Sequence, residues 1–135
     1  MEKTFVMIKP DGVRRKLIGE IIRRLETKGF ELPAMQMLQI NEEMAKEHYQ
    51  EHQGKEFFPR LIKHITSGPV VAMVWQGEDI IAQVRLMVGH RDPLKAEPGT
   101  IRGDYAQIST ENLVHAADCI DAAAREVRLF FPGLK

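Results

Sequence analysis

The sequence predicts an α+β fold, a β-α-β-β-α-β sandwich in which helices pack on one face of a four-stranded antiparallel sheet. Short apolar and β-branched runs alternate along the chain with longer segments whose apolar residues recur at helical spacing. Glycine, proline or asparagine stands at most junctions between them. With 135 residues and a hydrophobic fraction of 44%, the chain is expected to form a single domain, residues 1–135, around its own core.

Each predicted element has a start or a stop signal. The first strand runs into the turn Lys9-Pro10-Asp11-Gly12, and Gly29 ends the first helix. Asn41 caps the second helix and Asp118 caps the last one. The apolar run 70–75 predicts a central strand that is buried on both faces. The predicted strands are residues 4–8, 35–40, 70–75 and 113–114, and the predicted helices are residues 17–25, 41–52, 57–65, 80–87 and 118–131.

The charge balance and the single cysteine restrict the class of protein. Lys and Arg together number 19, as do Asp and Glu, so the net charge of zero argues against binding nucleic acid through bulk positive charge. Cys119 has no partner for an internal disulfide, which fits a reducing compartment. The sequence has neither a signal-peptide core nor an apolar run near the ~20 residues that span a bilayer. We therefore expect a cytoplasmic protein without a membrane or nucleic-acid partner.

The segment 89–112 fits no regular element, and loops of that length in small domains are usually functional or disordered. It carries Arg91 and Arg102 and leads directly to Asn112 and His115, which favours an ordered binding loop. Glycines flank Arg102, and an arginine held in such a turn can present its planar guanidinium to an anion. A plain surface loop is the alternative interpretation of the same pattern.

The segment His48-Tyr49-Gln50-Glu51-His52 matches the H-x-x-E-H pattern of one class of zinc hydrolase. In a helix this spacing places both imidazoles on one face with a carboxylate between them. No third ligand can be selected from the sequence, and short patterns of this kind also occur by chance. A zinc hydrolase is therefore an alternative hypothesis, weaker than an ordinary polar helix.

His115 follows the last short strand, and the small residues after it leave its imidazole accessible. A helix that starts at Asp118 and folds back beside this strand brings Glu126 level with His115. A carboxylate beside an imidazole fixes its tautomer and raises its basicity, whereas a lone histidine here would be structural. Lys9 and Arg85 are candidate anion contacts, although each also fits a solvated cation whose stem covers apolar surface.

Two aromatic side chains are candidates for a planar ligand. Phe57 and Phe58 are adjacent, so one helix cannot direct both into the core, and one is free to stack on a ring. The alternative is that it covers a subunit contact. Tyr49 is either a residue at the edge of the core or a hydroxyl donor to phosphate.

Together these segments resemble the nucleoside diphosphate kinase family along essentially the whole chain. Each block is modest alone, but their order and spacing are specific. The matching blocks are Lys9-Pro10-Asp11-Gly12-Val13, Gly19-Glu20-Ile21-Ile22, Lys28-Gly29-Phe30, His48-Tyr49, Phe57-Phe58, the segment from Ser67 to Trp75, Pro98-Gly99-Thr100-Ile101-Arg102-Gly103-Asp104 and Asn112-Leu113-Val114-His115.

The resemblance implies a ferredoxin-like fold that transfers the γ-phosphoryl group of a nucleoside triphosphate to a nucleoside diphosphate. It implies Mg²⁺ as cofactor, a ping-pong mechanism through a phosphohistidine, and a homo-oligomer, either a hexamer or a tetramer built on dimers. His115 corresponds to the nucleophile, Glu126 to the carboxylate that supports it, and Asp118 to a residue that contacts the metal through water. The residues that correspond to nucleotide contacts are Lys9, which is also catalytic, with Tyr49, Phe57, Leu61, Arg85, Arg102 and Asn112.

Several positions depart from the family pattern. Ala116 and Ala117 follow the histidine, so Ala117 lacks the serine hydroxyl expected to bond the supporting carboxylate. Arg91 replaces a threonine that contacts phosphate, where it is either an added cation or an obstruction, and Ser109 replaces an apolar residue against the base. We expect a weakened kinase, and the alternative is a catalytically silent nucleotide-binding scaffold of the same fold.

Overall fold

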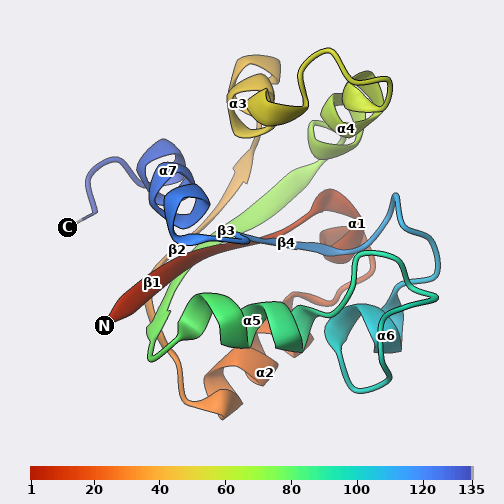
Figure 1. The fold of residues 1–135 in the computed structure, drawn as a ribbon. Helices are drawn as coiled ribbons and strands as arrows, with labels where there is room; N and C mark the ends of the chain where they lie inside the picture. The colour runs from red at the N-terminus through yellow and green to blue at the C-terminus, as the bar shows by residue number, and fades with distance from the viewer. Residues whose placement is uncertain (135) are drawn as a thin grey trace.

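The computed structural model describes residues 1–134 and confirms the α+β fold with a four-stranded antiparallel sheet (Figure 1). The strands lie in the order β2-β3-β1-β4, so β1 and β3 form the central pair. The strands are β1 (Glu2–Ile8), β2 (Glu31–Gln39), β3 (Pro69–Gly77) and β4 (Val114–Ala116). The helices are α1 (Pro10–Arg14), α2 (Ile18–Lys28), α3 (Glu42–His48), the 3₁₀ turn η1 (Gln50–His52), α4 (Phe58–Ile65), α5 (Ile80–Val88), α6 (Ile101–Tyr105) and α7 (Ile120–Phe130).

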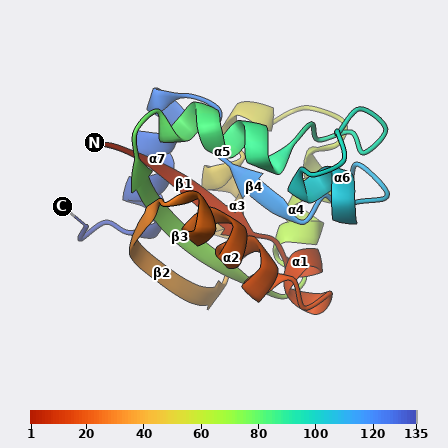
Figure 2. The same ribbon diagram turned by 90° about the horizontal axis from the view of Figure 1, so that it is seen from below.

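Helices cover both faces of the sheet, whereas the sequence analysis predicted one covered face. α2, α5 and α6 lie on one face, and α3, α4 and α7 lie on the other (Figures 1 and 2). The prediction was wrong because the central strands are apolar on both sides, and each side needs a layer of helices to exclude water.

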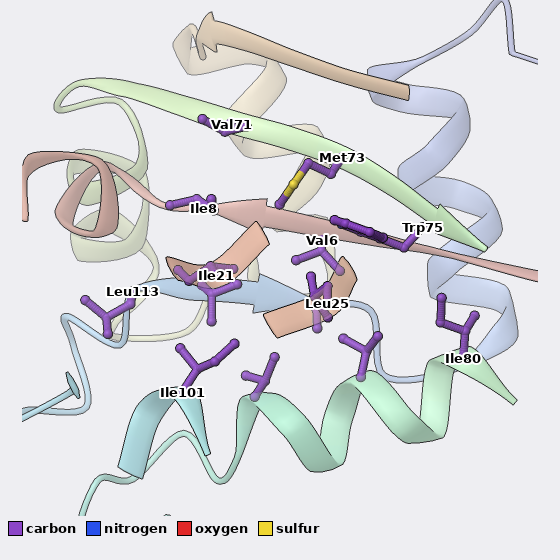
Figure 3. Close-up of a cluster of buried hydrophobic side chains, with 14 residues drawn as sticks. Val6, Ile8, Ile21, Leu25, Val71, Met73, Trp75, Ile80, Ile101 and Leu113 are labelled. Atoms are coloured by element: carbon purple, nitrogen blue, oxygen red, sulfur yellow. The ribbon is translucent and has the colours of Figure 1, made fainter. Parts of the chain in front are cut away.

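Alternate side chains of the central strands enter two separate cores. Val6, Met73 and Trp75 pack against α2 and α5 in the first core, which Figure 3 shows between the sheet and α5. Phe5 and Met7 point the other way into the second core, where the Phe5 ring stacks on Phe130 of α7 at a centroid distance of 4.6 Å. This alternation is the period of two that strand geometry imposes.

The pairing of β4 with β1 determines which face His115 occupies. Val114 and Ala116 belong to the first core, and Met7 of β1 lies opposite His115. Because successive side chains of a strand point to opposite faces, His115 is directed to the face that α7 covers.

Two early element boundaries differ from the prediction. The expected turn at residues 9–12 is the start of helix α1, where Pro10 stands at the first helical position, a place that suits its fixed φ. Asn41 caps α3 as predicted, since its Oδ1 accepts the Met44 N–H at 2.8 Å. That helix ends at His48 and not at His52, and η1 continues it as a tighter turn in which the His52 N–H bonds the Tyr49 carbonyl.

The later boundaries differ for local reasons. The segment 89–112 contains α6, whose cap Thr100 accepts the Gly103 N–H at 2.9 Å. β4 begins at Val114 because Leu113 has a φ of +76°, outside the β region. The cap of α7 is Cys119, not Asp118, and its Sγ accepts the Ala122 N–H at 3.4 Å.

Within residues 1–134, the helices are too short or too polar to cross a lipid bilayer.

Candidate active site

The predicted contact between His115 and Glu126 is present. His115 Nε2 lies 2.9 Å from Glu126 Oε1 and 3.0 Å from Oε2, so one ring nitrogen faces both carboxylate oxygens. Across the described residues 1–134, no group bonds the other nitrogen, Nδ1. In the tautomer whose Nε2–H donates a hydrogen bond to the carboxylate, Nδ1 keeps a free lone pair.

The surroundings favour a neutral imidazole. Burial lowers the pKa of His115, and the positive charges of Lys9, Arg102 and Arg85 lower it further. Burial also raises the pKa of Glu126, to about 7. His115 is therefore uncharged at neutral pH, which is the state in which its Nδ1 can act as a nucleophile.

His48 is part of the site, although the sequence analysis did not assign it there. It is buried on α3, its Nδ1 lies 3.8 Å from Glu126 Oε2, and its ring meets the His115 ring edge-on at 4.7 Å. Neither of its nitrogens has a hydrogen-bond partner among residues 1–134. His48 stands three residues after the apolar Ala45, so the two share one face of α3, and both are buried. This spacing is the signal by which the sequence could have identified His48 as buried.

The H-x-x-E-H interpretation of residues 48–52 is wrong. α3 ends at His48, so His52 stands on η1 and not one helical turn along the same face. The His52 ring lies instead near the rings of Tyr49 and Phe57, at 6.2 and 5.4 Å. In the described part of the chain, the one set of three candidate ligands is His48, His115 and Glu126.

Lys9 directly follows β1, and its charge acts on His115. Its Nζ donates to Asn112 Oδ1 at 3.0 Å, which joins two residues that the sequence assigned to nucleotide contacts. Burial lowers the pKa of Lys9 to about 8, partly offset by the charge of Asp11, and Arg102 lowers it as well. The ammonium is thus a desolvated charge, which interacts with a phosphate more strongly than a solvated one does.

Arg102 is buried in the first turn of α6, and its guanidinium donates to three backbone carbonyls. Burial is the main cause that lowers the pKa of Arg102 to about 10, and the positive charges of Arg85 and Arg91 lower it further. These two exposed arginines therefore lie close enough to act on the Arg102 guanidinium. The cations that the sequence analysis proposed therefore converge. The carbonyls and their distances from the guanidinium nitrogens are Val114 at 2.6 Å, Gly89 at 3.0 Å and Asn112 at 3.3 Å.

Arg24 of α2 forms hydrogen bonds to residues on both sides of Arg102. Its guanidinium bonds Asp104 Oδ2 at 2.7 Å, the Gly99 carbonyl at 3.2 Å and Glu20 Oε2 at 2.8 Å. It also lies 5.3 Å from the centre of the Tyr105 ring. These contacts hold residues 99–105 of the long segment in place, including helix α6, which was not expected from the sequence.

The aromatic candidates divide as expected. Phe57 is 40% exposed, whereas Phe58 packs against the second core beside Leu61. Tyr49 is buried, and burial raises its pKa, so its hydroxyl keeps its proton. Ser109 is exposed, and its carbonyl accepts an N–H of Asn112 at 3.1 Å.

Comparisons with known proteins identify the family. The family model described as nucleoside diphosphate kinase matches residues 2–135. Relatives of that name from Carboxydothermus hydrogenoformans and Thermus thermophilus are each 55% identical over 97% of this chain, which covers 88% and 96% of their lengths.

Solved structures of nucleoside diphosphate kinases have the same fold as this chain. The Encephalitozoon cuniculi nucleoside diphosphate kinase superposes with a TM-score of 0.95 at 40% identity, covering 97% of this chain and 89% of that one. The Halobacterium salinarum enzyme in complex with CDP gives a TM-score of 0.94 at 54% identity, covering 96% and 87%. The chain belongs to the nucleoside diphosphate kinase family and transfers a γ-phosphoryl group from a nucleoside triphosphate to a nucleoside diphosphate.

Proposed function

We propose that the phosphoryl group passes through Nδ1 of His115 in a ping-pong reaction. The observation that carries this proposal is the double contact of His115 Nε2 with the Glu126 carboxylate. It supports the tautomer whose Nδ1 lone pair is free, and the lowered pKa of His115 keeps that nitrogen unprotonated at neutral pH.

In the first half-reaction, the Nδ1 lone pair forms a bond to the γ-phosphorus of the nucleoside triphosphate. The bond between that phosphorus and the β–γ bridging oxygen breaks, and its electron pair leaves on the nucleoside diphosphate. The imidazole becomes positive, and Glu126 stabilises it through the Nε2–H, which stays in place. The second half-reaction reverses these steps with a different nucleoside diphosphate.

The cations and polar groups supply positioning and neutralisation, which this chemistry needs more than further covalent groups. Lys9, Arg85, Arg91 and Arg102 bind the phosphates. The Tyr49 hydroxyl donates to phosphate, and Asn112, the partner of Lys9, contacts the ribose and phosphates.

The base is held by stacking. The exposed Phe57 ring stacks on it, with Leu61 and Ser109 beside it. Because every base offers a ring face, this contact is tolerant of base identity. The relative solved with CDP binds a pyrimidine nucleotide, which fits such tolerance.

Mg²⁺ fits the residues at the site. Asp118 is exposed, and its charge raises the pKa of both Glu126 and His115, so it stands beside the nucleophile. Mg²⁺ is commonly held by one or two carboxylates together with substrate phosphates and water. Asp118 would hold it through water, and bound Mg²⁺ neutralises charge on the phosphates.

Two further proposals concern the setting of the enzyme. Met35 and Met37 are exposed on the edge strand β2, which supports a homo-oligomer, a hexamer or tetramer built on dimers. The exposed free thiol of Cys119 supports a reducing, cytoplasmic location. The zero net charge disfavours nucleic acid as a partner.

Initial-velocity kinetics test the mechanism. Varying ATP at several fixed concentrations of a pyrimidine nucleoside diphosphate should give parallel double-reciprocal lines, as expected when one product leaves before the second substrate binds. Intersecting lines would require a ternary complex and contradict the proposal. No turnover with intact nucleotide binding would favour the silent scaffold.

Ala117→Ser should raise kcat by at least about 5-fold, the equivalent of one supporting hydrogen bond. The added hydroxyl would bond Glu126 and hold it against His115. Ala116→Ser is the matched control, because Ala116 faces the first core and its hydroxyl would point away from Glu126. The test is to measure kcat of both variants by steady-state kinetics. An unchanged kcat for Ala117→Ser, or an equal gain in the control, would remove the role assigned to this position.

Arg91→Thr should raise the KM for ATP by about 5-fold, the upper range for an exposed ion pair, with a smaller effect on kcat. The charge of Arg91 already reaches Arg102, so it stands where it can bind the phosphates. Arg128→Thr, an exposed site on α7, serves as the control for loss of a surface charge. If kcat/KM rises instead, Arg91 obstructs the nucleotide site.

A further inference from the structure

Asp11 connects two segments that are far apart in the sequence. It lies on α1 and is only 4% exposed. Its Oδ2 accepts the backbone N–H of Leu113 at 2.9 Å, and its Oδ1 lies 3.0 Å from Nε2 of His64 on α4. From the sequence, Asp11 was expected in a turn and in a block that matches the family, without a role of its own, and no role was expected for His64.

Leu113 needs to be held in place. Its φ of +76° lies in the left-handed region, which a branched side chain adopts only when its surroundings impose it. Both polar groups of its backbone are engaged: its N–H by Asp11 and its carbonyl by the Lys9 N–H at 2.9 Å. Gly12 permits the approach, because a Cβ there would lie 2.7 Å from the Leu113 oxygen.

The residues on either side of Leu113 are those of the reaction. Asn112, which bonds Lys9, comes directly before it, and His115 follows two positions later. No bond joins Asp11 to His115 in the described chain, so Asp11 acts on the nucleophile through the backbone between them.

We propose that Asp11, held by His64, is a positioning residue whose bond to the Leu113 N–H sets Asn112 and His115 for phosphoryl transfer. The proposal rests on the phosphohistidine mechanism proposed above. A displacement of about 1 Å at a reacting group can cost about 100-fold in rate. The hydrogen bond that fixes the Leu113 backbone therefore affects the rate of the chemical step.

The state of the carboxyl group agrees with this role. Burial alone would raise the pKa of Asp11, yet its pKa lies below the usual value, because the His64 hydrogen bond and the charge of Lys9 favour the anion. An ionised oxygen is the stronger acceptor for a backbone N–H.

Two substitutions separate geometry from charge. Asp11→Asn keeps an oxygen at the position that accepts the Leu113 N–H but loses the charge. Asp11→Glu keeps the charge, but its extra methylene moves the carboxylate within a buried site. Asp11→Ala removes the hydrogen bond. The readouts are the rate constant of phosphoenzyme formation from ATP in a single turnover and the Kd for ADP.

We expect Asp11→Ala and Asp11→Glu to slow phosphoenzyme formation by at least about 30-fold, with a smaller rise in the Kd for ADP, because Asn112 also shifts. Asp11→Asn should recover most of the rate. Gly77→Ala is the control for general destabilisation, because its Cβ would meet the Phe30 ring 2.8 Å away at the far end of β3. It should lower Tm without slowing phosphorylation at a temperature well below that Tm.

The proposal is overturned if Asp11→Glu reacts at the parental rate, or if Asp11→Asn is as slow as Asp11→Glu. Should Asp11→Ala not fold, these two variants still decide it. A parent protein that forms no phosphoenzyme would instead contradict the proposed mechanism, so the two failures are distinguishable.

Discussion

Glu126→Gln is expected to slow phosphoenzyme formation by about 100-fold, within the range for the loss of one preorganised electrostatic contact. The ionised carboxylate of Glu126 can only accept a hydrogen bond from His115 Nε2–H, which leaves Nδ1 as the nitrogen with the free lone pair. A glutamine amide can also donate to Nε2, and that arrangement moves the ring proton to Nδ1. It would also leave the imidazolium of the transfer step without a counter-charge.

The pH dependence identifies the group responsible. The pKa of Glu126 is raised to about 7, and the active form is the ionised one, so the parental rate should fall as pH drops through that value. His115 has a lowered pKa and stays neutral over this range, so it does not produce the acid limb. In Glu126→Gln this limb should disappear.

Single-turnover rates between pH 5.5 and 8.5 provide the measurement, with the ATP concentration kept saturating throughout. Glu42→Gln is the matched control, since Glu42 is an exposed residue of α3 that pairs with the exposed Lys46. An acid limb that persists unchanged in Glu126→Gln would show that another group governs the nucleophile.

Lys9→Met should lower kcat/KM by about 1000-fold, the upper range for removing one donor to developing charge in a buried site. Methionine keeps much of the length of the stem but removes the ammonium and the bond to Asn112 Oδ1. Because burial lowers the pKa of Lys9 to about 8, the parental activity should also decline as pH rises above that value and the ammonium loses its proton.

The control for this substitution is Lys46→Met, which removes an exposed lysine from α3. Steady-state kinetics at pH 7 compare the two variants. A Lys9→Met enzyme within about tenfold of the parent would place the phosphates away from Lys9, since a lost charge-assisted contact in a buried site should cost more.

Elements with a strong local signal could be predicted from the sequence. The apolar run at residues 70–75 lies within the central strand β3, and Asn41 caps α3. The alignment of Glu126 with His115 was also predictable, because a helix that follows a strand closely folds back beside it. In each case the determining residues are neighbours or lie on one short connection.

The missed features depend on contacts between distant segments. Asp11 meets Leu113 across 102 positions, and no periodicity in either segment indicates it. In the sequence, His48 resembled a metal ligand paired with His52. Because α3 ends at His48, the two imidazoles do not share a helical face, and His48 instead lies buried beside Glu126. The second layer of helices was missed because apolar strands show that they are buried without showing what covers them.

The phosphohistidine mechanism is tested by incubating the protein and its His115→Ala variant with γ-labelled ATP and Mg²⁺ without an acceptor nucleotide. Label is expected on the parent alone, labile to acid, stable to base and discharged by added GDP. A parent that binds nucleotide but takes up no label, or label that persists in His115→Ala, would contradict the phosphohistidine mechanism.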